Sequence, residues 1–420
     1  MNNHVLRRST SSVVKSAIAL VFATAVLPAM ATSLEQAKRI HDRLAGVPPS
    51  SAVLTGMQAK IDANNAIGAA YDAMNNPAFY NATLKNWATP WTNRDGNKFA
   101  PLNDYTATVI GIVRDGATVD YRQVLFGDII YVPNPATYGA YSNSSNASYL
   151  ALESADGDMG NSSVLQKQTQ SSVTSLAASA TAGVVTTRAA ARAFFIDGTN
   201  RAMFRFTLKN HLCNDMEQVQ DVTRPSDRIR QDVSRSPGGD SRLFMNGCVG
   251  CHSGMDPMAQ AFAYYNFSYT GAGNEDSGQL VYTPGAVQPK YLINDTHFKE
   301  GYVTPNDHWD NYWRDGPNTA IFGWSNTHTV DLGNARNKNG IYGGVGAKSM
   351  LEELANSEAF AVCSVKKVFK AVCLRDPSES DRTTTVHGIA GFNQMLTDLK
   401  SSNYNLKQTF AQAAVYCSGN

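Results

Sequence analysis

Cys248-Val249-Gly250-Cys251-His252 is the stretch of the chain from which its organisation is best interpreted. It places two thiols and an imidazole in CxxCH spacing, which is typical of a c-type haem attachment site. Two intervening residues let both sulfurs reach the vinyl groups on one porphyrin edge, and the histidine that follows can give the iron its proximal nitrogen. We therefore expect one covalent haem c with its iron, held by Cys248 and Cys251 and ligated by His252.

Two other interpretations of the pentapeptide are a zinc half-site and a redox CxxC pair. Zinc would require a second Cys/His pair at short spacing, and a thioredoxin-like site would require a βαβ setting. The sequence offers neither pattern near residue 248.

The N-terminal residues predict export. Basic residues up to Lys15 precede an apolar run from Ala17 to Leu27, and Ala29-Met30-Ala31 has the small-x-small pattern of a cleavage site. Residues 1–31 therefore indicate a signal peptide, and the apolar run is shorter than the roughly 18 residues that a membrane span requires. We expect a periplasmic or secreted protein with no membrane span after signal removal.

Chain length and net charge limit the possible binding partners and the number of domains. The 36 basic and 35 acidic side chains nearly cancel, so charge does not indicate a nucleic-acid partner. A chain of 420 residues is long enough for more than one core. We predict an N-terminal, mostly helical region at 32–198 and a cytochrome c-like haem domain with C-terminal helices at 199–420.

Hydrophobic periodicity predicts a mainly α-helical protein with long loops. Expected helices include Ser33 to Leu44, a helix from Asp240 to Gly247 that ends at the CxxCH motif, and Ala347 to Phe360. The β-branched run from Thr106 to Val113 resembles a strand.

The remaining cysteines are Cys213, Cys363, Cys373 and Cys417, an even number that suggests two disulfides in an oxidising compartment. A helix from Cys363 to Cys373 would separate their Cα atoms by about 15 Å. Bridged cysteines lie within roughly 7 Å, so these two do not pair with each other. Each is expected to pair with Cys213 or Cys417.

Charged residues near the motif have two interpretations each. Arg228 and Arg230 could neutralise haem propionates through paired hydrogen bonds, or could belong to a solvated face. Asp256, before Pro257, is expected to cap a helix N-terminus, with a proton acceptor at the haem edge as the alternative. The second ring nitrogen of His252 is expected to donate to a backbone carbonyl.

The sixth iron ligand is the least determined feature. Met350 follows a glycine-rich run and opens a helix, a position from which a thioether could reach iron; the alternative is a helix core position. Further candidates are the histidines His41, His211, His297, His308, His328 and His387 and the methionines Met203, Met216 and Met395.

The segment CVGCHSGMDPMAQAFAYYNF, residues 248–267, resembles the CxxCHxxxDPxGxAxExFD segment of the planctomycete-type cytochrome c domain proteins. Further matches occur in the same order at residues 183–188, 200–201, 212–213, 360–363 and 404–406. The resemblance implies a shared fold and a covalent haem. Met258-Ala259 replaces the glycine of the pattern, and the Glu and Asp of its last part are absent here.

These features favour a monohaem c-type cytochrome that transfers electrons to and from periplasmic redox proteins. One alternative is a haem-dependent oxidase or peroxidase with an open distal site. Another is a haem-stapled binding protein whose contact surface is formed by its N-terminal aromatic residues, namely Tyr80, Trp87, Trp91, Tyr105 and Tyr121.

Overall fold

The computed structural model describes residues 32–229, 241–292, 301–324 and 342–419. The chain is mainly α-helical, as predicted. Its α-helices are α1 (Ser33–Ala45), α2 (Ser51–Asp62), α3 (Ala66–Ala73), α4 (Lys85–Ala88), α5 (Asp104–Arg114), α6 (Gln123–Phe126), α7 (Pro135–Tyr138), α8 (Ala147–Ser154), α9 (Gln170–Val173), α10 (Arg188–Phe194), α11 (Arg201–Thr207), α13 (Ser241–Gly247), α14 (Val249–Ala259), α15 (Asn318–Phe322), α16 (Gly346–Ala355), α17 (Glu358–Cys373), α18 (Phe392–Ser401) and α19 (Leu406–Tyr416).

The strands are short and pair as two-stranded antiparallel ribbons. The pairs are β1 (Ile130–Pro133) with β2 (Leu165–Gln168), β3 (Tyr265–Ser268) with β4 (Gln279–Tyr282), β5 (His308–Asn311) with β6 (Tyr342–Val345), and β7 (Thr385–Val386) with β8 (Ile389–Ala390).

The expected strand from Thr106 to Val113 is wrong, because these residues lie in α5. Asn103 caps this helix by accepting a hydrogen bond from the backbone N–H of Thr106 at 3.0 Å. Every residue from 104 to 113 is buried. A helix that is covered on all sides has no polar face, so its 3.6-residue period disappears from the sequence. What remains is a β-branched apolar run that cannot be told from a buried strand.

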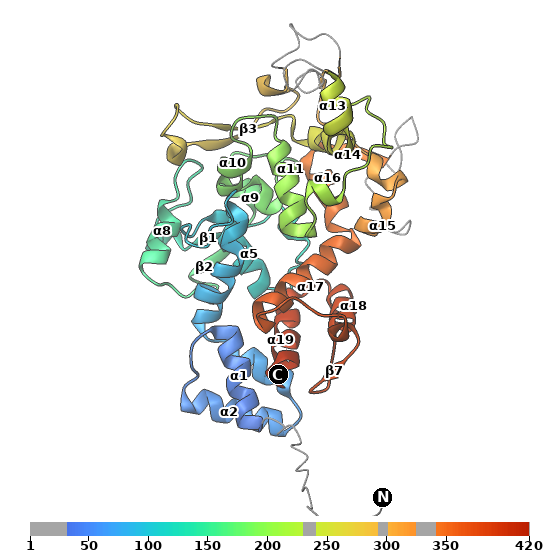
Figure 1. The fold of residues 1–420 in the computed structure, drawn as a ribbon. Helices are drawn as coiled ribbons and strands as arrows, with labels where there is room; N and C mark the ends of the chain where they lie inside the picture. Colours follow the sequence, from blue (N-terminus) through green and yellow to red (C-terminus); the bar gives the residue numbers. More distant parts are fainter. Residues whose placement is uncertain (1–31, 230–240, 293–300, 325–341, 420) are drawn as a thin grey trace, which may run out of the picture.

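The two ends of the described chain meet at one end of the molecule, where α1 packs against α19 (Figure 1). Thr32, expected to be the first residue after signal removal, forms a capping box with Glu35 at the start of α1. At the opposite end of the molecule lie α13 and α14, which carry the CxxCH motif (Figure 1). One continuous hydrophobic core connects the two ends, and its members lie on both sides of residue 198.

The helix expected from Ala347 to Phe360 is two helices, α16 and α17. Ser357 stands between them and accepts a hydrogen bond from the backbone N–H of Phe360 at 3.2 Å, which starts α17 as a new helix.

The prediction that Cys363 and Cys373 pair with Cys213 and Cys417, and not with each other, is confirmed, and the structure decides between the two pairings that the sequence left open. Cys213 bonds to Cys363 and Cys373 bonds to Cys417, with Cα separations of 5.3 and 5.5 Å. The second bridge joins the ends of α17 and α19 across 44 residues of sequence. In the chain-entropy description, closing a loop of that length stabilises the fold by about 4 kcal/mol.

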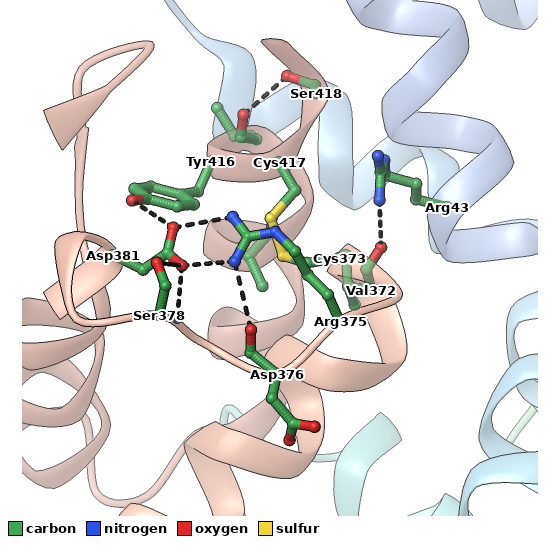
Figure 2. The surroundings of a disulfide bond; sticks show 12 residues. Arg43, Val372, Cys373, Arg375, Asp376, Ser378, Asp381, Tyr416, Cys417 and Ser418 are labelled. Carbon is green, nitrogen blue, oxygen red and sulfur yellow. Dashed lines mark hydrogen bonds and ion pairs between the residues drawn. A yellow bond between two sulfur atoms is a disulfide. The ribbon is translucent and has the colours of Figure 1, made fainter. Parts of the chain in front are cut away.

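Beside this bridge, the buried carboxylate of Asp381 gathers several donors (Figure 2). It accepts hydrogen bonds from Arg375 Nη2 at 2.9 Å, from the backbone N–H of Ser378 at 2.7 Å and from the Tyr416 hydroxyl at 3.1 Å. Arg375 lowers the pKa of Asp381 most, with Ser378 and Tyr416 adding to it, and burial opposes them.

This network predicts an acid-dependent loss of stability. A carboxyl group whose pKa is lowered by folding stabilises the protein above its unfolded pKa of about 3.9, and the contribution disappears as pH falls toward the folded value. The Asp381→Asn variant should be less stable at neutral pH, and the difference from the wild type should shrink from pH 5 to pH 2. Urea unfolding across this range measures it. Glu379→Gln, which alters an exposed pair with Arg382, is the control, and an equal effect of both variants would contradict the assignment.

Candidate functional site

The CxxCH motif forms the junction between α13 and the first turn of α14. Cys248 is the N-cap residue of α14, and its backbone N–H donates to the carbonyl of Phe244 at 2.9 Å, which closes α13. The backbone N–H of His252 donates to the carbonyl of Cys248 at 3.2 Å. One helical turn therefore fixes the relative positions of both thiols and the imidazole.

The six cysteines fall into two classes. Four form the two disulfides, whereas Cys248 and Cys251 are unpaired and half-buried. The Cys251 thiol lies 3.6 Å from the carbonyl oxygen of Met216. Burial raises the pKa of the Cys251 thiol, and the nearby acidic Glu217 acts in the same direction. A raised pKa is the opposite of the activated thiolate in a thioredoxin-like site.

Two glycines set the inner face of α14. A Cβ atom on Gly250 would lie 3.3 Å from Val222 Cγ1, and one on Gly254 would lie 2.0 Å from the Trp313 ring. The carbonyl of Gly250 also accepts a hydrogen bond from the backbone N–H of Asp221 at 2.8 Å. At position 254 only glycine lets the Trp313 indole approach the helix so closely, and at position 250 a side chain would require a small shift of the 220–222 segment.

His252 lies about 200° around the helix axis from Gly250, on the opposite face. Its Nδ1 lies 3.1 Å from both carboxylate oxygens of Asp256, one turn further along α14. An ionised carboxylate only accepts hydrogen bonds, so Nδ1 carries the proton and donates. This leaves Nε2 as the basic nitrogen of the ring.

Asp256 is in turn held by Arg201 of α11. Arg201 Nε donates to Asp256 Oδ1 at 2.7 Å, and Nη2 donates to Oδ2 at 3.1 Å. The side chain of Asp256 is fully buried, and that of Arg201 is 18% exposed. This bidentate pair supplies the positive charge that a buried carboxylate requires.

Two expectations about this region are therefore corrected. Asp256 does not cap a helix N-terminus, because α14 begins seven residues earlier at Val249 and continues through Pro257. The partner of the His252 ring is the Asp256 carboxylate and not a backbone carbonyl. Both corrections follow from the helix running unbroken through the motif, because residues 252 and 256 then lie one turn apart on the same helix face.

Apolar side chains surround the imidazole and the first cysteine. The ring centroid of Phe244 lies 5.5 Å from that of His252. Phe244 also forms a small hydrophobic cluster with Ile229 and Val249, against which Cys248 packs. Nearby, Val222 is 71% exposed and packs close to Gly250.

The two arginines expected near haem propionates have different outcomes. Arg228 already has protein partners: its guanidinium pairs with Asp310 and donates to Gln260 Oε1 at 2.7 Å and to the carbonyl of His308 at 3.1 Å. Arg230 lies outside the described residues. The Arg228 side chain is 16% exposed, so it does not lie on a solvated face, and its protein contacts give it a structural role.

Met350 is completely buried in α16, within the main hydrophobic core. This packing fits the core alternative better than a ligand position. His41 and His211 are also buried, with His211 accepting from or donating to the Tyr105 hydroxyl at 2.7 Å. Burial lowers the pKa of His211 to about 3.

The other candidate histidines lie elsewhere. His308 is exposed on β5, a strand that packs against α14. His387 lies at the β7–β8 turn beside Gly419. His297 and His328 lie outside the described residues.

The N-terminal aromatic residues do not form a contact surface. Tyr80, Trp91, Tyr105 and Tyr121 are buried in the main core, and Trp87 is partly buried against it.

The chemistry of these donors suits a covalent haem. Unpaired thiols in CxxCH spacing, apolar neighbours and an imidazole whose other nitrogen is occupied are what attachment and axial ligation require. Within the described ranges, no group of three or more His, Cys, Asp or Glu side chains is placed to hold a metal ion together.

No family model matches the chain, and neither the curated proteins nor the solved structures include a significant match.

Much of this site was accessible from the sequence, and one part was missed. The His252 and Asp256 pair could have been found from their spacing of four residues once the helix was assumed to pass through Pro257. Arg201 lies in one of the segments that resemble the cytochrome family, but the sequence did not indicate its partner, because Arg201 lies 55 residues before Asp256.

Two arginines on α11, Arg201 and Arg205, allow the loss of a buried ion pair to be compared with the loss of an exposed one. Asp256→Asn removes the buried negative charge that pairs with the partly buried Arg201 and should destabilise the protein by about 3 kcal/mol. Arg205, one turn further along α11, pairs with Asp215 at a more exposed position, so Asp215→Asn should cost less than about 1 kcal/mol. Urea denaturation measures both variants, and equal losses would contradict the structural role of Asp256.

Proposed function

We propose that this protein is an exported monohaem c-type cytochrome that transfers electrons. Cys248 and Cys251 would hold haem c through thioether bonds, and Nε2 of His252 would be the proximal iron ligand. The observation that carries the proposal is the division of the cysteines: two free thiols share one helical turn with His252, while the other four cysteines are paired.

When bound, haem c supplies a one-electron ferric/ferrous couple. The chain's own residues determine how the imidazole meets it. Asp256 accepts a hydrogen bond from Nδ1 and so orients the His252 ring, and Arg201 holds the Asp256 carboxylate through two hydrogen bonds. A carboxylate partner makes an imidazole a more basic ligand than a carbonyl partner does, which favours the oxidised metal.

Export to the periplasm or beyond is part of the proposal. The signal-like N-terminus and the two disulfides support an oxidising compartment. Among the described residues, no helix is both long enough and apolar enough to span a bilayer. We propose other exported redox proteins as electron donor and acceptor.

Covalent attachment is tested by peroxidase-activity staining after denaturing electrophoresis, with the protein made in a host that matures c-type cytochromes. The wild type should carry colour at its full-length band, and a Cys248→Ala/Cys251→Ala variant should lose it, because thioether bonds survive denaturation and axial bonds do not. Cys373→Ala/Cys417→Ala is the control and should keep the stain. A colourless wild-type band, or a stain that persists without the motif cysteines, would refute the proposal.

A second candidate function is a haem-dependent oxidase or peroxidase. The contact between the buried Asp256 carboxylate and His252 favours this second function, because a more basic proximal imidazole would donate more electron density to the metal. Absorption spectra of the ferrous protein with and without carbon monoxide separate the two functions. An unchanged spectrum supports the electron carrier, and rapid formation of a carbon monoxide adduct supports the open-site enzyme.

The carboxylate partner also predicts the direction of a redox shift. Asp256→Asn weakens the hydrogen bond that makes the imidazole basic, so the reduction potential should rise. Spectroelectrochemical titration of wild type and variant measures it, with Asp215→Asn as the control. A potential that does not change, or that falls, would contradict the assigned role of Asp256.

A further inference from the structure

A cavity of about 790 Å³ lies away from the CxxCH motif, between the 92–103 loop, the start of α8, helix α10 and the turn at residues 275–276. This volume falls within the roughly 300–1,000 Å³ of small-molecule binding sites. None of the residues that line the cavity belongs to α11, α13 or α14, so the cavity and the His252 site share no residue.

The cavity is lined by the side chains of Arg94, Arg188 and Arg192. Arg94 Nε donates to the carbonyl of Ala193 at 2.7 Å, and Arg188 Nε donates to the carbonyl of Gly278 at 2.9 Å. Backbone carbonyls thus fix two guanidinium planes without neutralising their charge. Arg188 is only 8% exposed, so one of these cations is built into the wall.

Acidic groups near the arginines compensate them incompletely. Arg192 pairs with Asp276 at 2.8 Å, but the Asp276 side chain is 88% exposed, so water screens this pair. Glu275 also lines the rim and accepts a hydrogen bond from the backbone N–H of Gly273 at 3.1 Å. Asp104 lies behind Arg188, where it accepts from the backbone N–H groups of Arg188 and Ala189 at 2.7 and 3.0 Å.

The rest of the lining is mixed, with apolar residues, mainly alanines, beside the polar residues Thr92, Asn93, Asn103, Ser145 and Asn146. Leu150 and Ile196 face the same cavity as the arginines, and Leu150 is 42% exposed. Phe99, on the loop that forms one wall, is 95% exposed and next in sequence to the lining residue Ala100. A row of cations beside an apolar surface suits a ligand with one charged end and one hydrophobic body.

We propose that this cavity binds a small organic carboxylate. The carboxylate would pair with the exposed Arg94 and Arg192, taking the place of the solvent-exposed Asp276 carboxylate beside Arg192, and the hydrophobic body would lie over Leu150 and Ile196. The inference does not depend on haem binding at His252.

Isothermal titration calorimetry of the mature full-length protein tests the proposal with benzoate, phenylacetate and hexanoate, each compared with its neutral amide. At least one carboxylate should bind, and about tenfold more tightly than its amide. Arg94→Gln/Arg192→Gln should weaken binding by at least about tenfold, since both ion pairs are lost. Ala147 is an exposed residue of the cavity lining. Ala147→Trp keeps all the charges but places a large ring in the cavity, so it should also weaken binding.

Arg382→Gln removes an exposed arginine near the C-terminus and should leave binding unchanged. The proposal is overturned if none of the carboxylates binds at millimolar concentration. It is also overturned if acids and amides bind equally, or if the cavity variants bind as the wild type does. None of these results bears on haem staining, so the two proposals fail independently.

Discussion

The buried carboxylate of Asp256 joins the imidazole of His252 to the guanidinium of Arg201, and so connects α14 with α11. A buried charge is costly unless it is paired and hydrogen-bonded, and here one carboxylate satisfies a cation and a ring N–H together. This contact fixes where the imidazole lies, which of its nitrogens is protonated and which nitrogen is basic. The proposed haem site lies at the end of the molecule that carries α14 (Figure 1), and its chemistry depends on this contact.

The opposite face of α14 explains why the helix can hold this position. Gly250 and Gly254 allow the 220–222 segment and Trp313 to pack against the helix backbone, so α14 is held from both sides. A larger residue at position 254 would collide with the indole ring. The thiols of Cys248 and Cys251 are thereby presented from a fixed helical turn, while the disulfides secure helices elsewhere in the chain.

The sequence was most informative where the signal is local. Cysteine spacing separated the motif pair from the four other cysteines, and the rise of a helix over ten residues excluded the pairing of Cys363 with Cys373. The sequence was least informative where tertiary contacts determine the secondary structure or the role of a residue. The α5 segment resembled a strand because complete burial removed its periodicity. Asp256 resembled a cap because aspartate before proline usually starts a helix, and its partner Arg201 is distant in sequence.

The account requires that Cys248 and Cys251 form bonds to haem and that the other four cysteines form disulfides. Peptide mapping of the unreduced, exported protein by mass spectrometry examines every cysteine at once. The peptide that contains Cys248 and Cys251 should be heavier by one haem, and Cys213 should be recovered linked to Cys363 and Cys373 linked to Cys417. An unmodified motif peptide, or a disulfide between Cys248 and Cys251, would contradict the account.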